Sequence, residues 1–245
     1  GGRVKRSVLS AYEKIRQTGI IGVGIAEDDE LLTARIATED QTVILGTAQG
    51  MSIRFAVTDA RAMGRGSMGV KGVALRTGDR VVGMDIIEDE TRQQVLSISA
   101  NGYGKRTPAT EYKVQGRSGQ GIITIKVSDR NGPVVGICEV TDEHEVLMMT
   151  SNGKIMRCAA SGISNIGRVT QGVRLMSLEA GEKVVSICPV QADSSTADSA
   201  ADEPAEEAAK DPMAQKVYDS FVKFRDQATA WHAVSEQAYM NARSL

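Results

Sequence analysis

Arginine and lysine side chains recur at similar intervals along residues 1–190, in most cases close to a glycine. One series closely follows a glycine of each repeat: Arg3, Lys5, Arg6, Arg54, Lys105, Arg106, Lys154 and Arg157. A second series lies in or just after glycine-rich stretches: Arg65, Lys71, Arg117, Lys126, Arg168 and Arg174. Cations at equivalent points of successive repeats would form a discontinuous positive belt, which suits the evenly spaced phosphates of duplex DNA. An arginine after a turn glycine can also be a solvated hairpin residue, and for any single copy this reading stays open.

A repeat of about fifty residues must position these side chains. The pattern Gly-x-x-x-Arg begins at positions 2, 50, 102 and 153, at intervals of 48, 52 and 51 residues. Nineteen residues after three of these glycines comes another, at Gly69, Gly121 and Gly172. Each unit contains short runs of β-branched or alternating residues that end at Gly, Asn or Asp, and this pattern predicts about four strands per repeat.

The repeat predicts an all-β fold of propeller-like blades. The turns Ala100-Asn101-Gly102 and Ser151-Asn152-Gly153 favour tight hairpins, because Asn-Gly supplies the positive φ that such turns need. A single four-stranded sheet cannot bury both of its faces, so repeats of this size pack side by side as blades. We expect three complete blades and the second half of another.

Composition and charge narrow the possible functions. Residues 1–190 carry 24 Lys and Arg against 21 Asp and Glu, a net +3, whereas residues 191–245 carry 5 against 10, a net −5. No apolar run approaches the roughly 18 residues that would cross a bilayer. The three cysteines form no CxxC pair, and with two histidines in the chain a metal site is not expected. The start, Gly1-Gly2-Arg3, predicts a piece of a longer protein, and we expect a cytoplasmic location.

Several motifs resemble the later blades of the C-terminal domain of the bacterial DNA gyrase A protein. They are Asn101–Thr107 followed by Glu111-Tyr112, Ile163–Arg168 followed by Thr170–Val173, Val70–Leu75, and Lys126-Val127 followed by Asn131–Gly136. The likeness runs through nearly all of residues 2–190. It implies a partial β-pinwheel, a propeller variant whose neighbouring blades exchange strands. It also implies a surface that binds and wraps duplex DNA, so that strand passage introduces negative supercoils.

The resemblance also implies partners and limits. The partners would be duplex DNA, the gyrase B protein and the rest of the gyrase A protein. ATP and Mg would be used by the full enzyme, with no cofactor in this chain. The family's glutamine- and arginine-rich box belongs to a blade upstream of Gly1, and the similar segment Gln115–Gly121 lies in a later blade, so the role of the box is not transferred to it. The breakage–reunion domain with its nucleophilic tyrosine is not in this sequence, and we expect no catalytic residue and no topoisomerase activity from the chain alone.

The last quarter of the chain has a different composition. Residues 191–211 are rich in Ala, Ser, Asp and Glu, which predicts a disordered acidic linker. Asp211-Pro212 then predicts the start of an amphipathic helix over residues 212–245. The segment Trp231–Tyr239 resembles the C-terminal helix of periplasmic TRAP-transporter solute-binding proteins. A chimeric chain and a family-specific helical extension both remain possible readings.

Two other functions compete with DNA binding. A protein-interaction propeller could use the same basic rim to dock acidic partners. An enzyme centred on a blade axis is a weaker alternative, because the sequence has no acid–base cluster.

Overall fold

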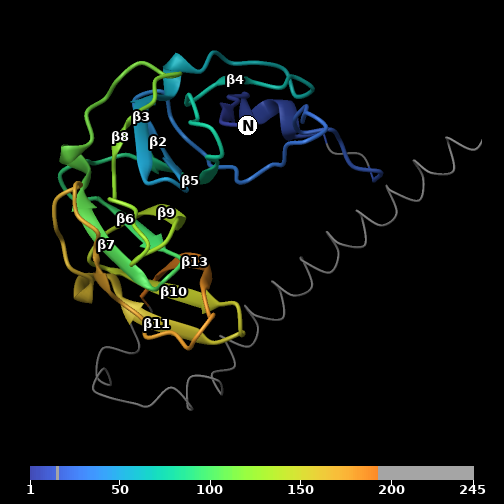
Figure 1. The fold of residues 1–245 in the computed structure, drawn as a ribbon. Helices are drawn as coiled ribbons and strands as arrows, with labels where there is room; N and C mark the ends of the chain where they lie inside the picture. The colour runs from blue at the N-terminus through green and yellow to red at the C-terminus, as the bar shows by residue number, and fades with distance from the viewer. Residues whose placement is uncertain (15–16, 193–245) are drawn as a thin grey trace, which may run out of the picture. The chain divides into compact units, whose positions relative to one another are not determined.

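The computed structural model describes residues 1–14 and 17–192, and in these residues all regular structure is β-strand or short 3₁₀ turn (Figure 1). The described residues belong to one compact unit, Gly1–Ser195. Of the predicted linker over residues 191–211, Gln191 still belongs to a β-strand, while the linker from residue 193 on and the predicted helix over residues 212–245 lie outside the described residues.

The strands fall into the four predicted repeats. They are β1 (Arg3–Val4), β2 (Thr42–Thr47), β3 (Met51–Ala56), β4 (Val70–Lys71), β5 (Val81–Ile87), β6 (Gln94–Ser99), β7 (Tyr103–Pro108), β8 (Ile122–Ile123), β9 (Val134–Val140), β10 (His144–Thr150), β11 (Ile155–Ala159), β12 (Val173–Arg174) and β13 (Val184–Gln191). The 3₁₀ turns are η1 (Leu9–Tyr12), η2 (Val57–Asp59), η3 (Ala109–Glu111) and η4 (Ala160–Gly162). The second, third and fourth repeats each contribute four strands, as predicted.

Neighbouring repeats exchange a strand. The sheets have the orders β5-β2-β3-β8, β12-β7-β6-β9, β11-β10-β13 and β1-β4, with every pair antiparallel. The two-residue strand at one edge comes from the next repeat: β8 belongs to the third repeat but pairs with β3 of the second. This exchange is the arrangement of a β-pinwheel, and it confirms the predicted fold class.

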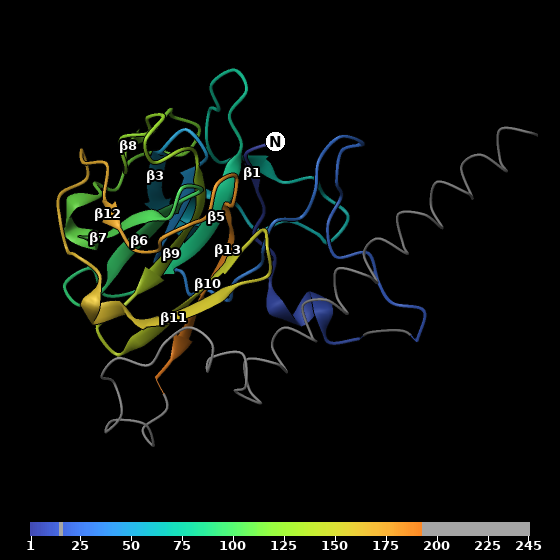
Figure 2. The ribbon, with the colours of Figure 1, turned by 60° about the horizontal axis from the view of Figure 1, so that its bottom comes forward.

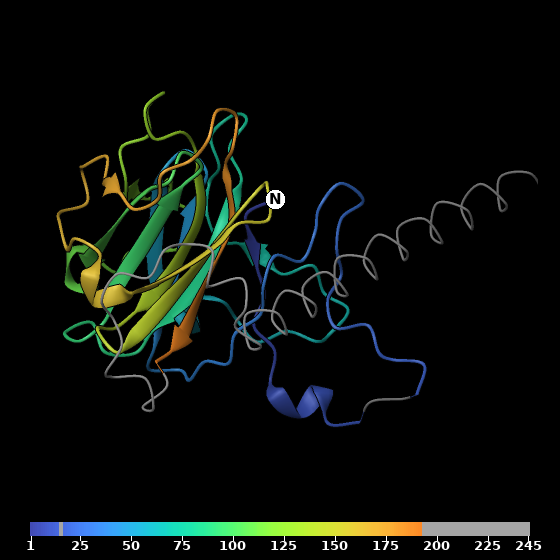
Figure 3. The ribbon, with the colours of Figure 1, turned by 90° about the horizontal axis from the view of Figure 1, so that it is seen from below.

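The sheets pack on one another through strands β5, β9 and β13, which lie side by side (Figures 2 and 3). Both faces of the sheet that contains β2 and β3 are covered by other parts of the domain. The two strands are therefore buried along nearly their whole lengths rather than on alternate residues. Glycine permits close packing of these strands: a Cβ on Gly46 would lie 2.2 Å from a methyl carbon of Ile137 in the next blade. The buried apolar residues form three clusters, each of which includes residues of two successive repeats.

The first repeat is different. Its described residues supply only β1 and η1, and residues 17–38 contain no strand. A cavity of about 780 Å³ lies between this repeat and the sheet of β5, β2 and β3, with Val43, Leu45 and Phe55 among its lining residues. The expected half blade is thus a two-stranded sheet rather than part of a four-stranded one.

Candidate nucleic-acid interface

The arginine four residues after the repeat glycine joins one repeat to the next. Arg106 donates from Nε to the Ile163 carbonyl at 2.9 Å and from Nη2 to the Ser161 carbonyl at 3.1 Å, both at the η4 turn. Arg54 donates to two carbonyls at the η3 turn, and Arg6 donates to the Ala60 carbonyl just after η2. In so short a turn most of these carbonyls have no backbone donor, and the guanidinium supplies one; the Ala109 carbonyl also accepts from the Tyr112 N–H at 3.0 Å.

Each of these arginines also binds a carboxylate. Arg6 meets Glu39 at 2.6 Å, Arg54 meets Glu90 at 2.7 Å, and Arg106 contacts Asp142. Arg54 and Arg106 are only 5% exposed. The expectation that these two side chains lie on an exposed rim is therefore wrong, and both are structural links between blades. Arg157, at the same position of the last repeat, is more exposed and pairs with Glu145 of the neighbouring strand β10.

The lysine before this arginine has a related role in the first and third repeats. Lys105 is fully buried and donates from Nζ to the Gly167 and Arg168 carbonyls at 2.5 and 2.6 Å. Its counterpart Lys5 is partly buried and binds two carbonyls in the same way. Burial lowers the pKa of Lys105 to about 8, because desolvation disfavours the charged amine. The prediction of an exposed cation is wrong for Lys105 as well.

The arginines of the glycine-rich stretches hold the exchanged strands. Arg117 donates from Nη1 to the Lys71 carbonyl at 3.0 Å, and Arg168 does the same to the Ile123 carbonyl at 2.9 Å. Both side chains are partly buried. Arg65 occupies the same place in the second repeat, but its Nη1 is buried without a hydrogen-bond partner among the described residues.

The strand register shows that Lys126 does not occupy the same position in its repeat as Lys71 and Arg174 do in theirs. Lys71 pairs with Arg3, Ile123 with Met51, and Arg174 with Tyr103. Lys71 therefore corresponds to Ile123 and Arg174, whereas Lys126 lies three residues beyond this position.

The remaining predicted residues keep exposed or partly exposed side chains. Lys71, Lys126 and Arg174 are exposed. Arg3 is also exposed, but its guanidinium donates to the Met68 and Gly69 carbonyls at 3.1 and 2.7 Å. Lys154 lies 3.6 Å from both Glu179 and Glu182. Fewer than the fourteen predicted cations therefore have a side chain that an external anion could contact.

Two exposed arginines, Arg130 and Arg174, flank one tyrosine, Tyr103, beside the exchanged strand β12. We call Tyr103, Lys126, Arg130, Arg174 and Lys183 the Tyr103 cluster. Arg174 donates to the tyrosine hydroxyl at 3.1 Å, and the guanidinium carbons of Arg130 and Arg174 lie 4.9 and 5.6 Å from the ring centre. These two arginines lower the pKa of the Tyr103 hydroxyl through hydrogen bonding.

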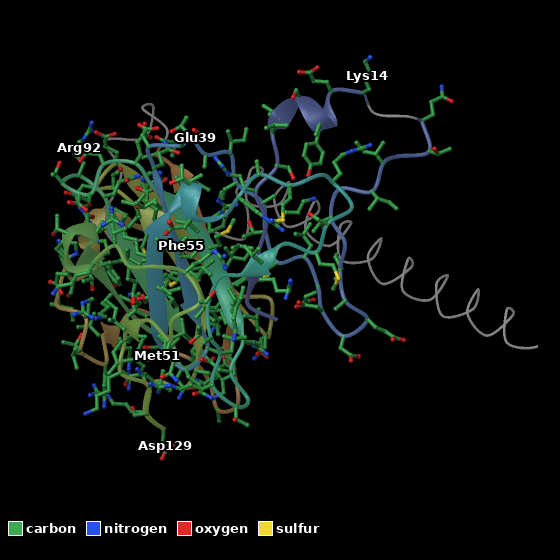
Figure 4. All side chains as sticks on the ribbon, turned by 90° about the horizontal axis from the view of Figure 1, so that it is seen from above. Lys14, Glu39, Met51, Phe55, Arg92 and Asp129 are labelled. Atoms are coloured by element: carbon green, nitrogen blue, oxygen red, sulfur yellow. The ribbon has the colours of Figure 1, made fainter. Side chains whose placement is uncertain are left out.

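Asparagine side chains tie the cluster together. Asn101 donates to the Arg130 carbonyl at 3.0 Å and accepts from Lys183 at 2.7 Å, while Asn131 donates to the Lys126 carbonyl at 3.0 Å. Figure 4 shows the neighbouring Asp129 at the same end of the domain as Met51, with Arg92 and Glu39 at the other. The cluster thus combines two arginines at the tyrosine ring with two exposed lysines, one joined through the Lys126 carbonyl and one through the Lys183 ammonium group. Such a group fits phosphate oxygens, since guanidinium and ammonium groups are their usual partners in proteins.

Sequence reasoning missed four exposed cations. Arg130 and Lys183 belong to the cluster but have no glycine pattern of the kind that identified the others. Arg61 and Lys113 are exposed and lie eleven residues after Gly50 and Gly102 respectively, so the repeat itself could have identified them.

The described residues contain no group of three or more His, Cys, Asp or Glu side chains that could hold a metal ion. Within the same part of the chain, no helix has the length and apolar character needed to span a membrane.

Comparison with known proteins identifies the family. A family model described as DNA gyrase C-terminal domain, beta-propeller, matches residues 1–38, 41–88, 93–137 and 144–190. The DNA gyrase A protein of Staphylococcus epidermidis (strain ATCC 12228 / FDA PCI 1200) is 43% identical over 189 residues, which cover 77% of this chain and 21% of that protein. Its counterpart from Lawsonia intracellularis (strain PHE/MN1-00) is 44% identical over 185 residues, covering 75% of this chain and 23% of that protein. The chain thus spans about a fifth of the length of these curated relatives.

Solved structures show the same architecture. The structure of a DNA gyrase A C-terminal domain matches with a TM-score of 0.68 at 26% identity, over 77% of this chain and 62% of that one. The C-terminal domain of a DNA topoisomerase IV matches with a TM-score of 0.73 at 21% identity, over 78% of this chain and 59% of that one, and shows the fold alone. The resemblance inferred from the blade motifs is confirmed, and the chain belongs to the DNA gyrase C-terminal domain, beta-propeller, family.

Proposed function

We propose that this domain binds duplex DNA through its phosphates, without preference for base sequence, and that it wraps DNA as part of a gyrase. The observation that carries the proposal is the Tyr103 cluster, in which the exposed Arg130 and Arg174 flank one tyrosine, while two exposed lysines are joined to the same turns through Asn101 and Asn131. Phosphate contacts fix the position of a duplex but carry no sequence information, so the affinity should vary little between base sequences.

Local placement matters more than total charge here. Residues 1–190 have a net charge of only +3, which would attract DNA weakly if the charges were spread evenly. Arg54, Lys105 and Arg106 use their cationic groups inside the protein, so the attraction must come from exposed residues such as those of the cluster.

Salt dependence tests the binding. The logarithm of the association constant should fall by about 0.9 per phosphate contact for each tenfold rise in salt. We expect the Arg130→Ala/Arg174→Ala variant to bind more weakly and with a shallower salt slope. The control is Lys14→Ala/Arg92→Ala, which removes the same charge from exposed residues outside the cluster (Figure 4). Equal losses in the two variants would show that total charge, not the cluster, governs binding.

Wrapping requires a separate measurement. The chain is incubated with relaxed closed-circular DNA and a nicking–closing enzyme, and the linking number is read after the protein is removed. We expect a change of one sign that grows with protein concentration. Tight binding with an unchanged linking number would contradict the proposal that the domain wraps DNA, but not the proposal that it binds DNA.

The activity of a whole enzyme is proposed from family membership. The partners would be the gyrase B protein and the rest of the gyrase A protein, in the cytoplasm, with ATP and Mg used outside this domain. A gyrase whose A protein carries Arg130→Ala/Arg174→Ala should lose negative supercoiling while it still cleaves DNA. Equal loss of both activities would contradict a role limited to wrapping.

A further inference from the structure

A buried lysine fixes the direction of two peptide groups in the glycine-rich stretch of the fourth repeat. Lys105 donates from Nζ to the carbonyl oxygens of Gly167 and Arg168, so both carbonyls point into the protein. In a trans peptide the N–H group points away from the carbonyl of the same peptide unit, and the described residues contain no cis peptide bond. The N–H groups of Arg168 and Val169 therefore point away from Lys105.

These two N–H groups form a site for an anion. Successive backbone N–H groups that turn away from a buried cation make a concave surface of the kind that binds anions in proteins. Arg168 adds its guanidinium to the same site, and the ammonium group of Lys105 lies behind it, where it holds the two carbonyls. The site thus combines two N–H donors with two positive charges.

The site already holds a carboxylate of the protein itself. Glu111, at the end of the η3 turn of the third repeat, accepts from the Arg168 N–H at 3.2 Å, and the same oxygen lies 3.9 Å from Arg168 Nε. Both oxygens of this carboxylate lie within 4.0 Å of the Cβ position of Gly167. Burial lowers the pKa of Lys105 to about 8, and the charge of Glu111 opposes this decrease. The Glu111 carboxylate therefore lies where the oxygens of an external anion would bind.

The carboxylate satisfies the site only in part. The Nε atom of Arg168 is buried and has no hydrogen-bond partner in the described part of the chain, because 3.9 Å is too long for a hydrogen bond. Within the same residues the Val169 N–H has no partner either. The Glu111 side chain is 40% exposed, so it can leave the site without disturbing the core. A phosphate group has enough acceptor oxygens to bind all three donors.

The preceding junction between repeats lacks both the site and the contact. Ile53 stands where the third repeat has Lys105, and Asp59 ends η2 as Glu111 ends η3. The Asp59 carboxylate forms no hydrogen bond or ion pair with any residue that the structure describes. Gly116, which corresponds to Gly167, has nothing within 4 Å of its Cβ position. The carboxylate thus occupies the glycine-rich stretch at the junction where a lysine prepares it for an anion.

We propose that this site binds a phosphate of duplex DNA and that the phosphate displaces Glu111, which acts as an internal competitor. The inference rests on the proposed DNA-binding function, and it adds a contact of that function together with its regulation. A lone phosphate must compete with a carboxylate that is already in place. A duplex held elsewhere on the domain presents its next phosphates at high effective concentration, so that one of them replaces Glu111.

Glu111→Gln tests the competition, because it removes the charge of the competitor and keeps its size. The affinity for DNA should rise by about three- to fivefold, the range expected for the loss of a partly exposed ion pair. Asp59→Asn is the matched control, since it removes one charge from the equivalent position of the preceding repeat. It should change the affinity by less than about 1.5-fold, because salt screens a charge that does not touch the phosphate.

Arg168→Gln shows whether the gain arises at this site. In the Arg168→Gln background, Glu111→Gln should raise the affinity by less than about 1.5-fold, because competitor and phosphate share that arginine. Fluorescence anisotropy with a labelled duplex, at one ionic strength, measures the affinity of each full chain, and urea unfolding checks that each variant is folded. The comparison of Glu111→Gln with Asp59→Asn needs no change at Arg168, so it decides the question even if that substitution disturbs the fold.

Each outcome bears on a different claim. No gain in Glu111→Gln, an equal gain in Asp59→Asn, or an undiminished gain in the folded Arg168→Gln background would overturn the inference and leave DNA binding in place. Failure of every protein, the unsubstituted chain included, to bind the duplex would overturn the proposed function as well.

Discussion

Arg106 and Asp142 lie in successive repeats, thirty-six residues apart, and their side chains form an ion pair next to the η4 turn. The same guanidinium binds the Ile163 and Ser161 carbonyls, so a single side chain joins two blades. Arg54 and Glu90 repeat the arrangement at the same separation. The same interblade contact thus forms twice, because the arginine and the acidic residue recur at the same separation in successive repeats.

Replacing Arg106 by alanine should therefore destabilise the fold. The change leaves two turn carbonyls without their donor, and we expect a loss of about 3 kcal/mol in the free energy of unfolding. Arg157→Ala is the matched control, because Arg157 is more exposed and pairs with Glu145 within its own hairpin, and it should cost less than about 1 kcal/mol. Urea unfolding followed by circular dichroism measures both. Similar losses would show that Arg106 is not an interblade link.

The repeat period predicted the strands well but could not assign these arginines. The hairpins of successive repeats turn at a glycine with positive φ, at Gly50, Gly102 and Gly153, so the glycine spacing revealed the hairpins and the period directly. A cation that recurs once per repeat, however, is compatible both with an exposed rim and with a buried position between blades, because both kinds of position also recur once per repeat. The acidic residue thirty-six positions after Arg54 and Arg106 was the available signal for burial.

The binding cluster was less predictable for a different reason. Arg130 and Lys183 join Tyr103 only through the fold, because they come from separate turns of the third and fourth repeats. The position of Lys126 in the repeat also depended on the strand register. Glycine spacing alone left an error of three residues in that position. The link between β3 and β8 decides that register, and it is a contact between repeats rather than within one.

The buried lysine gives the domain a pH-dependent stability. The pKa of Lys105 is about 8 in the folded state against an ordinary value of 10.5. Between these pH values the unfolded chain holds a proton that the folded chain has released, so stability rises with pH across this window. The Lys105→Met variant should lack this rise.

Comparing the unsubstituted protein with Lys105→Met separates the contribution of Lys105 to pH-dependent stability from those of other titratable groups. Burial also raises the pKa of Tyr112 to about 12, which makes stability fall above pH 10 in both proteins. The difference in unfolding free energy between them should change by an amount on the order of 1–3 kcal/mol from pH 8 to pH 10. A constant difference over that range would mean that Lys105 keeps its ordinary pKa.

Glycines at the strand-exchange joints should tolerate alanine poorly. Gly121 and Gly78 both have φ near +72°, so alanine is strained to a similar degree at either position. Only Gly121 also has a carbonyl oxygen 2.1 Å from its Cβ position. We expect Gly121→Ala to lower the free energy of unfolding by about 1–3 kcal/mol more than Gly78→Ala. Equal effects, measured by urea unfolding, would show that the joint is loose enough to accept a side chain.

Removal of residues 191–245 should tighten DNA binding. This segment has a net charge of −5 beside a domain of net +3, and most of its acidic residues lie between positions 193 and 211. A tethered polyanion would have a high effective concentration around the domain and would compete with DNA phosphates for its exposed cations. Since salt screens this competition, the gain in affinity should be largest at low ionic strength and should shrink as salt rises. Fluorescence anisotropy with a labelled duplex measures both proteins over the same salt series. A variant in which the acidic residues of 191–211 become Asn or Gln serves as the control for length. If this variant binds like the full chain while the truncated one binds more tightly, the segment blocks DNA by its bulk rather than by its charge.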